Sequence, residues 1–246
     1  MKDTVLFDLG GTLVRYYTHQ EFPPILGRCV AEVRGLLARR GLLRLDPEAI
    51  AERVAAEDHE DPGLRVRPLE ERLIRIFDLD EVLEGPRFMG DLCRRFMGPI
   101  FQTARVYDDA VPVLRDLRAE GLRTGLVSNT PWGCPADLWR EDLGRLGLAG
   151  LFDAVVFCRD AGWRKPAREI FDFALRALAA GPEQCLFVGD DPRWDTHGAR
   201  AAGMSAVLID RDGAEHPPHE TVIAGLRGLW TQLRLPEIAK DEEPGE

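Results

Sequence analysis

The chain opens with a short apolar run, Thr4-Val5-Leu6-Phe7, which stops at Asp8-Leu9-Gly10-Gly11-Thr12. A run of β-forming residues that ends in a carboxylate and two glycines is typical of a buried strand that feeds a sharp turn. We therefore expect Asp8 at the carboxyl end of a strand. Open α/β sheets place their chemistry at these strand ends.

A different pattern runs from about Thr18 to Thr103, where apolar residues recur at spacings of three and four. This spacing predicts amphipathic helices. Asp46-Pro47 and Gly41 are typical of a helix start and a helix stop. The predicted helices cover residues 25–40, 47–57, 69–78 and 87–101, with a loop over residues 58–67.

From Val106 onward the pattern changes to an alternation of helices and strands. Strands that are separated by helices of this length predict parallel βαβ units with right-handed crossovers. With residues 4–7, five strands are expected. The other predicted strands cover residues 123–127, 154–157, 185–188 and 205–209, and the predicted helices cover 109–120, 136–146, 167–179, 194–202 and 221–233.

The first strand precedes the helical segment and the other strands come after it, so the helical segment is predicted to be an insertion in an α/β fold. We expect a Rossmann-like parallel sheet core from residues 1–14 and 105–235. An inserted all-helical cap over the strand ends is expected from residues 15–104. Residues 236–246 form an acidic tail that is predicted to be disordered.

Composition limits the class of partner. The formal net charge of −10 argues against a nucleic-acid-binding surface, because phosphate backbones favour basic faces. A few local cations still suffice for a small phosphorylated metabolite. The five cysteines are scattered and odd in number, and no run is long enough to span a membrane. With no signal peptide evident, we expect a soluble cytoplasmic protein.

Chemically useful side chains come directly after three of the predicted strands or begin the helices next to them. A carboxylate ends the first strand, a Ser-Asn pair ends another, a lysine precedes a helix, and carboxylates end a third strand. Each feature alone has an ordinary explanation as a cap, a turn or a solvated charge. Together they are expected to converge, because the carboxyl ends of parallel strands meet at one edge of the sheet. The residues are Asp8, Ser128, Asn129, Lys165, Asp190 and Asp195.

This set of residues predicts a phosphoryl-transfer site. A carboxylate can attack phosphorus and form an acyl-phosphate. The attack of an anion on a dianion requires charge neutralisation, which Mg²⁺ held by hard oxygen ligands can supply. Asp8 and Asp190 are the natural carboxylate ligands, while Ser128 and Lys165 can hold phosphate oxygens.

The four segments resemble the motifs of the haloacid dehalogenase-like hydrolase superfamily, and they occur in the same order. They are Asp8-Leu9-Gly10-Gly11-Thr12, Ser128-Asn129, Lys165-Pro166 and Gly189-Asp190-Asp191-Pro192-Arg193-Trp194-Asp195. The helical insertion resembles the C1 cap of that family, many of whose members are Mg²⁺-dependent phosphatases.

The resemblance implies a role for each matching residue. Asp8 is the nucleophile and a metal ligand, and Lys165 acts with it and binds phosphate together with Ser128 and Asn129. The metal ligands are Asp8, the carbonyl of Gly10, Asp190 and, directly or through water, Asp195.

Gly10 departs from the family pattern, in which phosphatases usually carry a second Asp that protonates the leaving group and later activates water. General acid–base catalysis is worth about 10²–10⁴-fold, so its loss matters most for poor leaving groups. The acid can come from elsewhere, and Tyr16, Tyr17, His19 and Glu21 are the nearest candidates. Alternatively, the substrate has a good leaving group, or the protein binds a phosphorylated ligand with little turnover.

The sequence therefore favours Mg²⁺-dependent hydrolysis of a small phosphomonoester through an aspartyl-phosphate on Asp8. A phospho-ligand-binding protein with weak or no turnover is the main alternative. A 2-haloacid dehalogenase is a lesser one, because Asp190 favours a metal site that such enzymes do not need. Trp132 and Trp163 are expected either to shape the pocket or to pack in the core. The cap arginines are expected on solvated faces, although one or two could read a second anionic group of the substrate.

Overall fold

The computed structural model describes residues 2–57, 63–79, 85–214, 216 and 220–233. The predicted acidic tail and residues 58–62 of the predicted loop lie outside the described residues.

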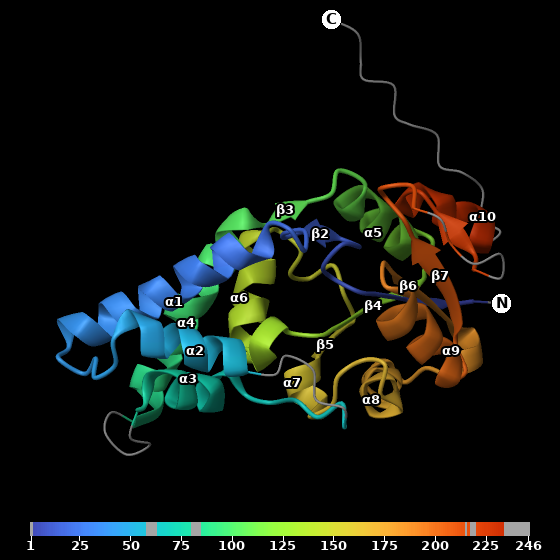
Figure 1. Ribbon diagram of the computed structural model, residues 1–246. Helices are drawn as coiled ribbons and strands as arrows, with labels where there is room; N and C mark the ends of the chain where they lie inside the picture. Colours follow the sequence, from blue (N-terminus) through green and yellow to red (C-terminus); the bar gives the residue numbers. More distant parts are fainter. Residues whose placement is uncertain (1, 58–62, 80–84, 215, 217–219, 234–246) are drawn as a thin grey trace, which may run out of the picture.

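Within these residues a six-stranded parallel sheet forms the centre of the fold, in the order β5-β4-β1-β6-β7-β8 (Figure 1). β1 lies inside the sheet, paired on one side with β4 and on the other with β6. The strand order thus reverses at β1, which creates the crevice where α/β sheets bind ligands. The predicted α/β fold is confirmed. The strands are β1 (Thr4–Phe7), β4 (Arg123–Ser128), β5 (Ala154–Phe157), β6 (Cys185–Gly189), β7 (Ser205–Ile209) and β8 (Val222–Ile223).

Both faces of the sheet are covered by helices, which is why the strands are continuous apolar runs rather than alternating ones. Val5 and Phe7 of β1 point to the face packed by α5 (Ala110–Ala119), whereas Leu6 points to the face packed by α8 (Arg168–Leu178). This alternation follows from the two-residue period of a strand. A rigid, doubly covered strand therefore holds Asp8 in place.

In the described part of the chain, four helices separate β1 from α5, as the apolar spacing predicts, and they lie beside the sheet in Figure 1. α1 packs along α4, and α3 packs on α4. No described helix, not even the longest two, is apolar enough over its length to cross a bilayer. The four are α1 (Phe22–Arg39), α2 (Pro47–Ala56), α3 (Leu69–Phe77) and α4 (Gly85–Thr103).

Two segments, β2 (Val14–Arg15) and β3 (Arg105–Val106), connect the sheet to these helices, and they lie side by side. They pair as a short antiparallel ribbon. The predicted domain boundaries, after residue 14 and before residue 105, fall on this ribbon. The ribbon is thus a natural junction between the two parts.

Aromatic packing also joins the inserted helices to the sheet region. The ring of Trp139, in α6 (Ala136–Arg145), lies 5.0 Å from the ring of Phe101 in α4, and Trp132 lies 5.2 Å from Phe96. One continuous apolar cluster therefore runs from α1 and α4 to the sheet. Trp132 packs in this cluster, which settles one of the two alternatives for it.

Two predicted helices differ from the observed structure. The predicted helix 194–202 begins two residues earlier, as the π-helix η3 (Pro192–His197), and continues as α9 (Gly198–Ala201), because Asp191 caps it. The predicted helix 221–233 is wrong in its first half. There β-branched residues add the edge strand β8, and only α10 (Leu229–Leu233) is α-helical.

A segment between α2 and α3, Leu64–Arg67, crosses to the sheet region, and we call it the strap. The Arg164 N–H donates to the Leu64 carbonyl at 2.8 Å, and the Val66 N–H donates to the Gly162 carbonyl at 3.2 Å. The Arg65 guanidinium lies 3.9 Å from the centre of the Trp163 ring. Trp163 thus anchors the strap.

The strap also lies against Gly133, and this contact can be tested. Gly133 has a φ of +66°, and a Cβ there would fall 1.9 Å from the Arg67 carbonyl oxygen. Gly147 has a φ of +71° with nothing within 4 Å of a Cβ, so it is a matched control. Alanine in this backbone region costs about 1–2 kcal/mol, and overpacking adds about 1–3 kcal/mol. Gly133→Ala should therefore lower the free energy of unfolding more than Gly147→Ala, as measured by urea denaturation. Equal losses would show that the strap does not press on Gly133.

Candidate active site

Asp8 lies at the carboxyl end of β1, where its backbone N–H donates to the Val188 carbonyl of β6 at 2.9 Å. The residue is only 7% exposed. The turn after it requires glycine at position 11, which has a φ of +77°. A Cβ on Gly11 would fall 2.0 Å from Asp190 Oδ2. Gly11 therefore allows Asp190 to approach the turn closely.

Lys165 links the two carboxylates on either side of it. Its Nζ donates to Asp8 Oδ1 and to Asp195 Oδ1, both at 2.5 Å, and the residue is 2% exposed. Burial by itself would lower the pKa of Lys165, but the charges of Asp195 and Asp8 outweigh burial and raise it. Lys165 is therefore a buried ammonium at neutral pH.

The side chain of Asn129 forms hydrogen bonds with the backbone of Lys165. The Lys165 N–H donates to Asn129 Oδ1 at 2.8 Å, and Asn129 Nδ2 donates to the Lys165 carbonyl at 3.2 Å. Both ends of the amide are thus engaged, which makes Asn129 a positioning residue for Lys165. Phosphate binding by Asn129 stays a prediction. Ser128, at the end of β4, is buried and lines the same cavity as Lys165.

The three carboxylates after β6 have different surroundings. Asp191 caps η3, accepting from the N–H groups of Arg193 and Trp194 at 2.8 and 2.9 Å. Asp195 is buried, and its Oδ2 accepts from the Asp191 N–H at 3.1 Å. Asp190 lines the cavity next to Asp8. The sequence prediction that singled out Asp190 and Asp195 therefore agrees with their placement together.

The carboxylates of Asp8, Asp190 and Asp195 fit a divalent cation. One oxygen of each lies within 4.8 Å of the others. These are hard oxygen donors, which Mg²⁺ prefers. Three carboxylates facing one ammonium leave an excess of two negative charges when all four are ionised, and a divalent cation would neutralise this excess. Gly10 lines the same cavity, and its carbonyl remains a predicted ligand.

The pKa values of these carboxylates also indicate a cation site. Burial and then the charges of Asp8 and Asp195 raise the pKa of Asp190 to about 8. Burial also raises the pKa of Asp195, to about 7, although Lys165 opposes the shift. Asp190 is reached by solvent on its cavity side, yet the surrounding protein still disfavours its charge. Raised carboxylate pKa values indicate negative charge that the protein alone does not fully compensate.

A cavity of about 330 Å³ opens over these residues. It brings together all the predicted site residues. It also contains residues that the sequence analysis did not single out for the site, since no spacing marks an aromatic ring or an arginine as pocket-forming. The lining consists of Asp8, Gly10, Gly11, Tyr16, Tyr17, Ser128, Asn129, Pro131, Trp139, Arg164, Lys165, Asp190, Asp191, Trp194 and Asp195.

None of the four nearby candidates is well suited to replace an acid at position 10. Tyr16 donates to Asp142 Oδ2 at 3.0 Å, and burial together with the Asp142 charge raises its pKa well above the usual range. Burial raises the pKa of Tyr17 to about 12. The Thr18 N–H and the Arg15 guanidinium lower the pKa of Glu21, so it is ionised at neutral pH. His19 is exposed and, unlike the tyrosines, is not part of the described cavity lining.

Comparison with known proteins places the chain among hydrolases. The sequence profile described as haloacid dehalogenase-like hydrolase matches residues 2–203. A phosphoglycolate phosphatase of Cereibacter sphaeroides is 31% identical over 94% of this chain and 95% of its own length.

Two further relatives match over different lengths. A phosphoserine phosphatase of Thermus thermophilus is 36% identical over 58% of this chain, and the match spans only 55% of that relative. A phosphatase structure from Thermococcus onnurineus superposes with a TM-score of 0.65 at 26% identity, covering 97% of this chain and 100% of the other.

The raised pKa values predict how Mg²⁺ binding depends on pH. A carboxylate must lose its proton to bind a metal, and Asp190 and Asp195 hold theirs up to about pH 8 and 7. Each displaced proton weakens apparent affinity about tenfold per pH unit below the pKa. Calorimetric titration with Mg²⁺ should therefore give a dissociation constant at least about tenfold larger at pH 6 than at pH 8, with proton release.

Two variants complete the experiment. Asp190→Asn should abolish the high-affinity binding, whereas Asp191→Asn should keep it, because Asp191 caps η3 and asparagine also caps helices. A dissociation constant that does not change between pH 6 and pH 8 would contradict the electrostatic account.

Proposed function

We propose that this chain, which belongs to the haloacid dehalogenase-like hydrolases, hydrolyses a small phosphomonoester with Asp8 as the nucleophile. The observation that carries the proposal is the contact of Lys165 with Asp8 and Asp195 beside Asp190, at the carboxyl ends of the strands. A carboxylate held this way has a fixed direction and a nearby cation. Those are the requirements of an attack on a phosphate dianion.

The names of the relatives support phosphate esters as the substrate class. Phosphoserine, phosphoglycolate and glyceraldehyde 3-phosphate phosphatases all match parts or nearly all of the chain. Each of these names describes a small phosphorylated metabolite. We therefore assign a substrate of similar size, which agrees with a cavity of about 330 Å³.

In the proposed reaction an oxygen of Asp8 attacks phosphorus, the bond from phosphorus to the ester oxygen breaks, and the leaving oxygen takes its proton from water. Water then attacks the aspartyl-phosphate, which releases phosphate and restores Asp8. Ser128 and Lys165 hold phosphate oxygens. Mg²⁺, held by Asp8, Asp190, Asp195 and the Gly10 carbonyl, would neutralise the charge of the phosphoryl group. Lys165 donates a hydrogen bond to Asp8 and places a positive charge beside the attacking carboxylate.

We assign the helices α1–α4 the role of a cap, within the boundaries 15–104. The sheet core would comprise residues 1–14 and 105–235. The β2–β3 ribbon supports this division, because it is where the chain crosses twice. A cap beside the site excludes water from the reacting groups and selects the substrate.

Gly10 favours a substrate whose leaving group needs little protonation. Tyr16 and Tyr17 have raised pKa values, and Glu21 is ionised, so none of these residues is a good acid near neutral pH. The same observation supports a second candidate, a phospho-ligand-binding protein with negligible turnover. The two differ in whether an activated ester is hydrolysed.

Phosphate release separates the two candidates. We expect Mg²⁺-dependent release from acetyl phosphate and p-nitrophenyl phosphate, whose leaving groups are good, and much slower release from a sugar phosphate. Asp8→Asn should abolish all of it. Rapid hydrolysis of the sugar phosphate would mean that an acid comes from outside positions 8–12. No release from any ester would instead favour the binding protein.

Restoring the acid provides a direct test of the role of position 10. A Cβ on Gly10 has room, because its nearest neighbour would be Tyr16 Cδ2 at 3.8 Å. Gly10→Asp should raise turnover of a sugar phosphate by about 10²-fold or more, with little change for p-nitrophenyl phosphate. Gly10→Asn has the same size without the acid and should give no gain. Equal turnover by the two variants would mean that the missing carboxyl group is not what limits catalysis.

A further inference from the structure

Part of the wall of the active-site cavity consists of aromatic rings that have no role in the proposed mechanism. Tyr16, Tyr17 and Trp139 all line the cavity. The rings of Tyr16 and Trp139 meet edge to face, with 5.3 Å between their centres. A Cβ on Gly10 would lie 3.8 Å from Tyr16 Cδ2. The aromatic wall therefore begins directly beside the position where the acid is absent.

The polar atoms of two of these rings are turned away from the cavity. The Tyr16 hydroxyl donates to Asp142 Oδ2 at 3.0 Å, and Asp142 Oδ1 accepts from Arg145 Nε at 2.8 Å. The indole nitrogen of Trp139 is buried. Tyr16 and Trp139 therefore present carbon atoms rather than donors or acceptors to a ligand. Such a wall favours an apolar group on the substrate.

The same rings contact the inserted helices. Tyr17 stacks on Phe22, the first residue of α1, with 4.9 Å between the ring centres, and Trp139 lies 5.0 Å from Phe101 of α4. In an in-line displacement the leaving oxygen lies opposite the attacking oxygen, which here belongs to Asp8. The ester group of a substrate then points away from the sheet edge, toward the inserted helices and the rings that contact them.

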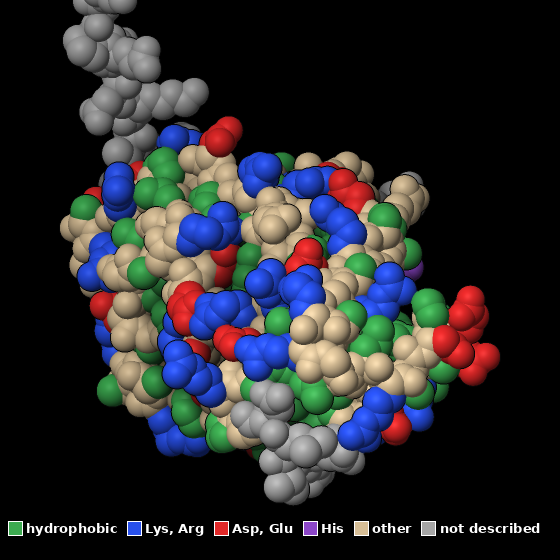
Figure 2. Space-filling model, turned by 90° about the vertical axis from the view of Figure 1, so that its left-hand side faces the viewer, with side chains coloured by type: hydrophobic (Ala, Val, Ile, Leu, Met, Phe, Trp, Pro, Cys, Tyr) green, Lys and Arg blue, Asp and Glu red, His purple; other side chains and the backbone are tan. Residues whose placement is uncertain are grey.

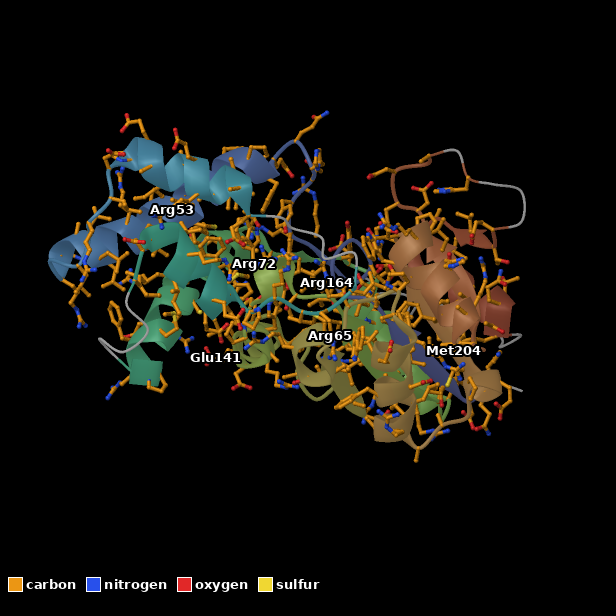
Figure 3. All side chains as sticks on the ribbon, turned by 60° about the horizontal axis from the view of Figure 1, so that its bottom comes forward. Arg53, Arg65, Arg72, Glu141, Arg164 and Met204 are labelled. Carbon is orange, nitrogen blue, oxygen red and sulfur yellow. The ribbon has the colours of Figure 1, made fainter. Side chains whose placement is uncertain are left out.

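The charged residues of the lining disfavour a second anionic group on the substrate. Lys165 is hydrogen-bonded to Asp8 and Asp195, and Arg164 lies beside the strap, near Arg65 (Figure 3). An excess of two negative charges remains when all the charged lining residues are ionised, and a bound phosphate dianion adds to it. The ester group is therefore expected to be neutral. The charged lining residues are Asp8, Asp190, Asp191, Asp195, Arg164 and Lys165.

We propose that the substrate is the phosphate monoester of a small phenol, whose ring packs against Tyr16, Tyr17 and Trp139. This inference rests on the proposed function, since it takes Asp8 as the nucleophile. A phenolic hydroxyl has a pKa of about 10, far below that of a sugar alcohol, so a phenolate leaves without the acid that position 10 lacks. The bond from Asp8 to phosphorus forms as the bond from phosphorus to the phenolic oxygen breaks, and the phenolate takes a proton from water.

The experiment compares three phosphate esters by calorimetric titration, with Mg²⁺, into protein carrying Asp8→Asn, so that none is turned over. Phenyl phosphate carries the aromatic ring. Cyclohexyl phosphate has the same number of carbon atoms in a ring that is not aromatic, and glycerol 3-phosphate has a polar ester group. The variant is Tyr17→Leu. The matched control is Tyr107→Leu, because Tyr107 is also a partly buried tyrosine but packs under Arg211, at 3.7 Å, and is not among the described lining residues.

We expect phenyl phosphate to bind at least about tenfold more tightly than glycerol 3-phosphate, because its ring is removed from water. It should bind about three- to tenfold more tightly than cyclohexyl phosphate, because aromatic pairs add to the effect of burial. Tyr17→Leu should weaken the binding of phenyl phosphate by about three- to tenfold and leave that of glycerol 3-phosphate nearly unchanged. Tyr17→Phe, which keeps the ring, and Tyr107→Leu should both retain the preference.

Phenyl phosphate that binds no more tightly than glycerol 3-phosphate, or than cyclohexyl phosphate, would overturn the proposal. So would an equal loss for all three esters in Tyr17→Leu, because that result describes a structural role. The comparison of the esters needs no substitution at Tyr17, so the test stands even if Tyr17→Leu does not fold. The proposed function has a separate readout in the hydrolysis of acetyl phosphate, which has a good leaving group but no ring, by protein with Asp8 intact. The two ideas can therefore fail independently.

Discussion

The site depends on one buried ammonium placed between two buried carboxylates. Without Lys165, Asp8 and Asp195 would face each other in a region with little water, where unpaired charges are strongly disfavoured. The remaining architecture serves this placement. Asn129 forms two hydrogen bonds with the Lys165 backbone, and the strap forms backbone hydrogen bonds with Gly162 and Arg164 of the adjoining loop. The strap thus connects the inserted helices to the loop that carries Lys165. The helices α1–α4 themselves contribute none of the described lining residues of the cavity. Figure 2 shows the molecule from the side of these helices.

Two adjacent glycines in the first turn have opposite meanings. Gly11 is required by geometry, because any side chain there would overlap Asp190. Gly10 has room for a side chain, so packing does not explain the missing acid. The need for a residue without a side chain explains Gly11 but not Gly10. The absence of a carboxyl group at position 10 is therefore a chemical property of this chain rather than a by-product of its fold.

Sequence patterns predict the residues at a strand end better than the residues packed around it. Asp8, Lys165, Asp190 and Asp195 could be predicted together, because parallel strands bring their carboxyl ends to one edge. Arg164 could not, since its position depends on a backbone contact with the strap that no spacing encodes. The last predicted helix is wrong in part because the apolar residues of 221–233 fit a helix, whereas pairing with the edge of β7 favours a strand. In both cases, contacts with segments distant in the sequence determine the structure.

The position of β1 has a consequence for how the chain acquires its structure during synthesis. Thr4 is paired with Arg123 on one side and with Cys185 on the other. During synthesis β1 therefore has no neighbour in the sheet until β4 has been made, and its second neighbour, β6, arrives later still. Such distant pairing slows folding and leaves an apolar edge open in the meantime. The β1 strand and the Asp8 turn after it are therefore fixed in place only when the sheet around them forms.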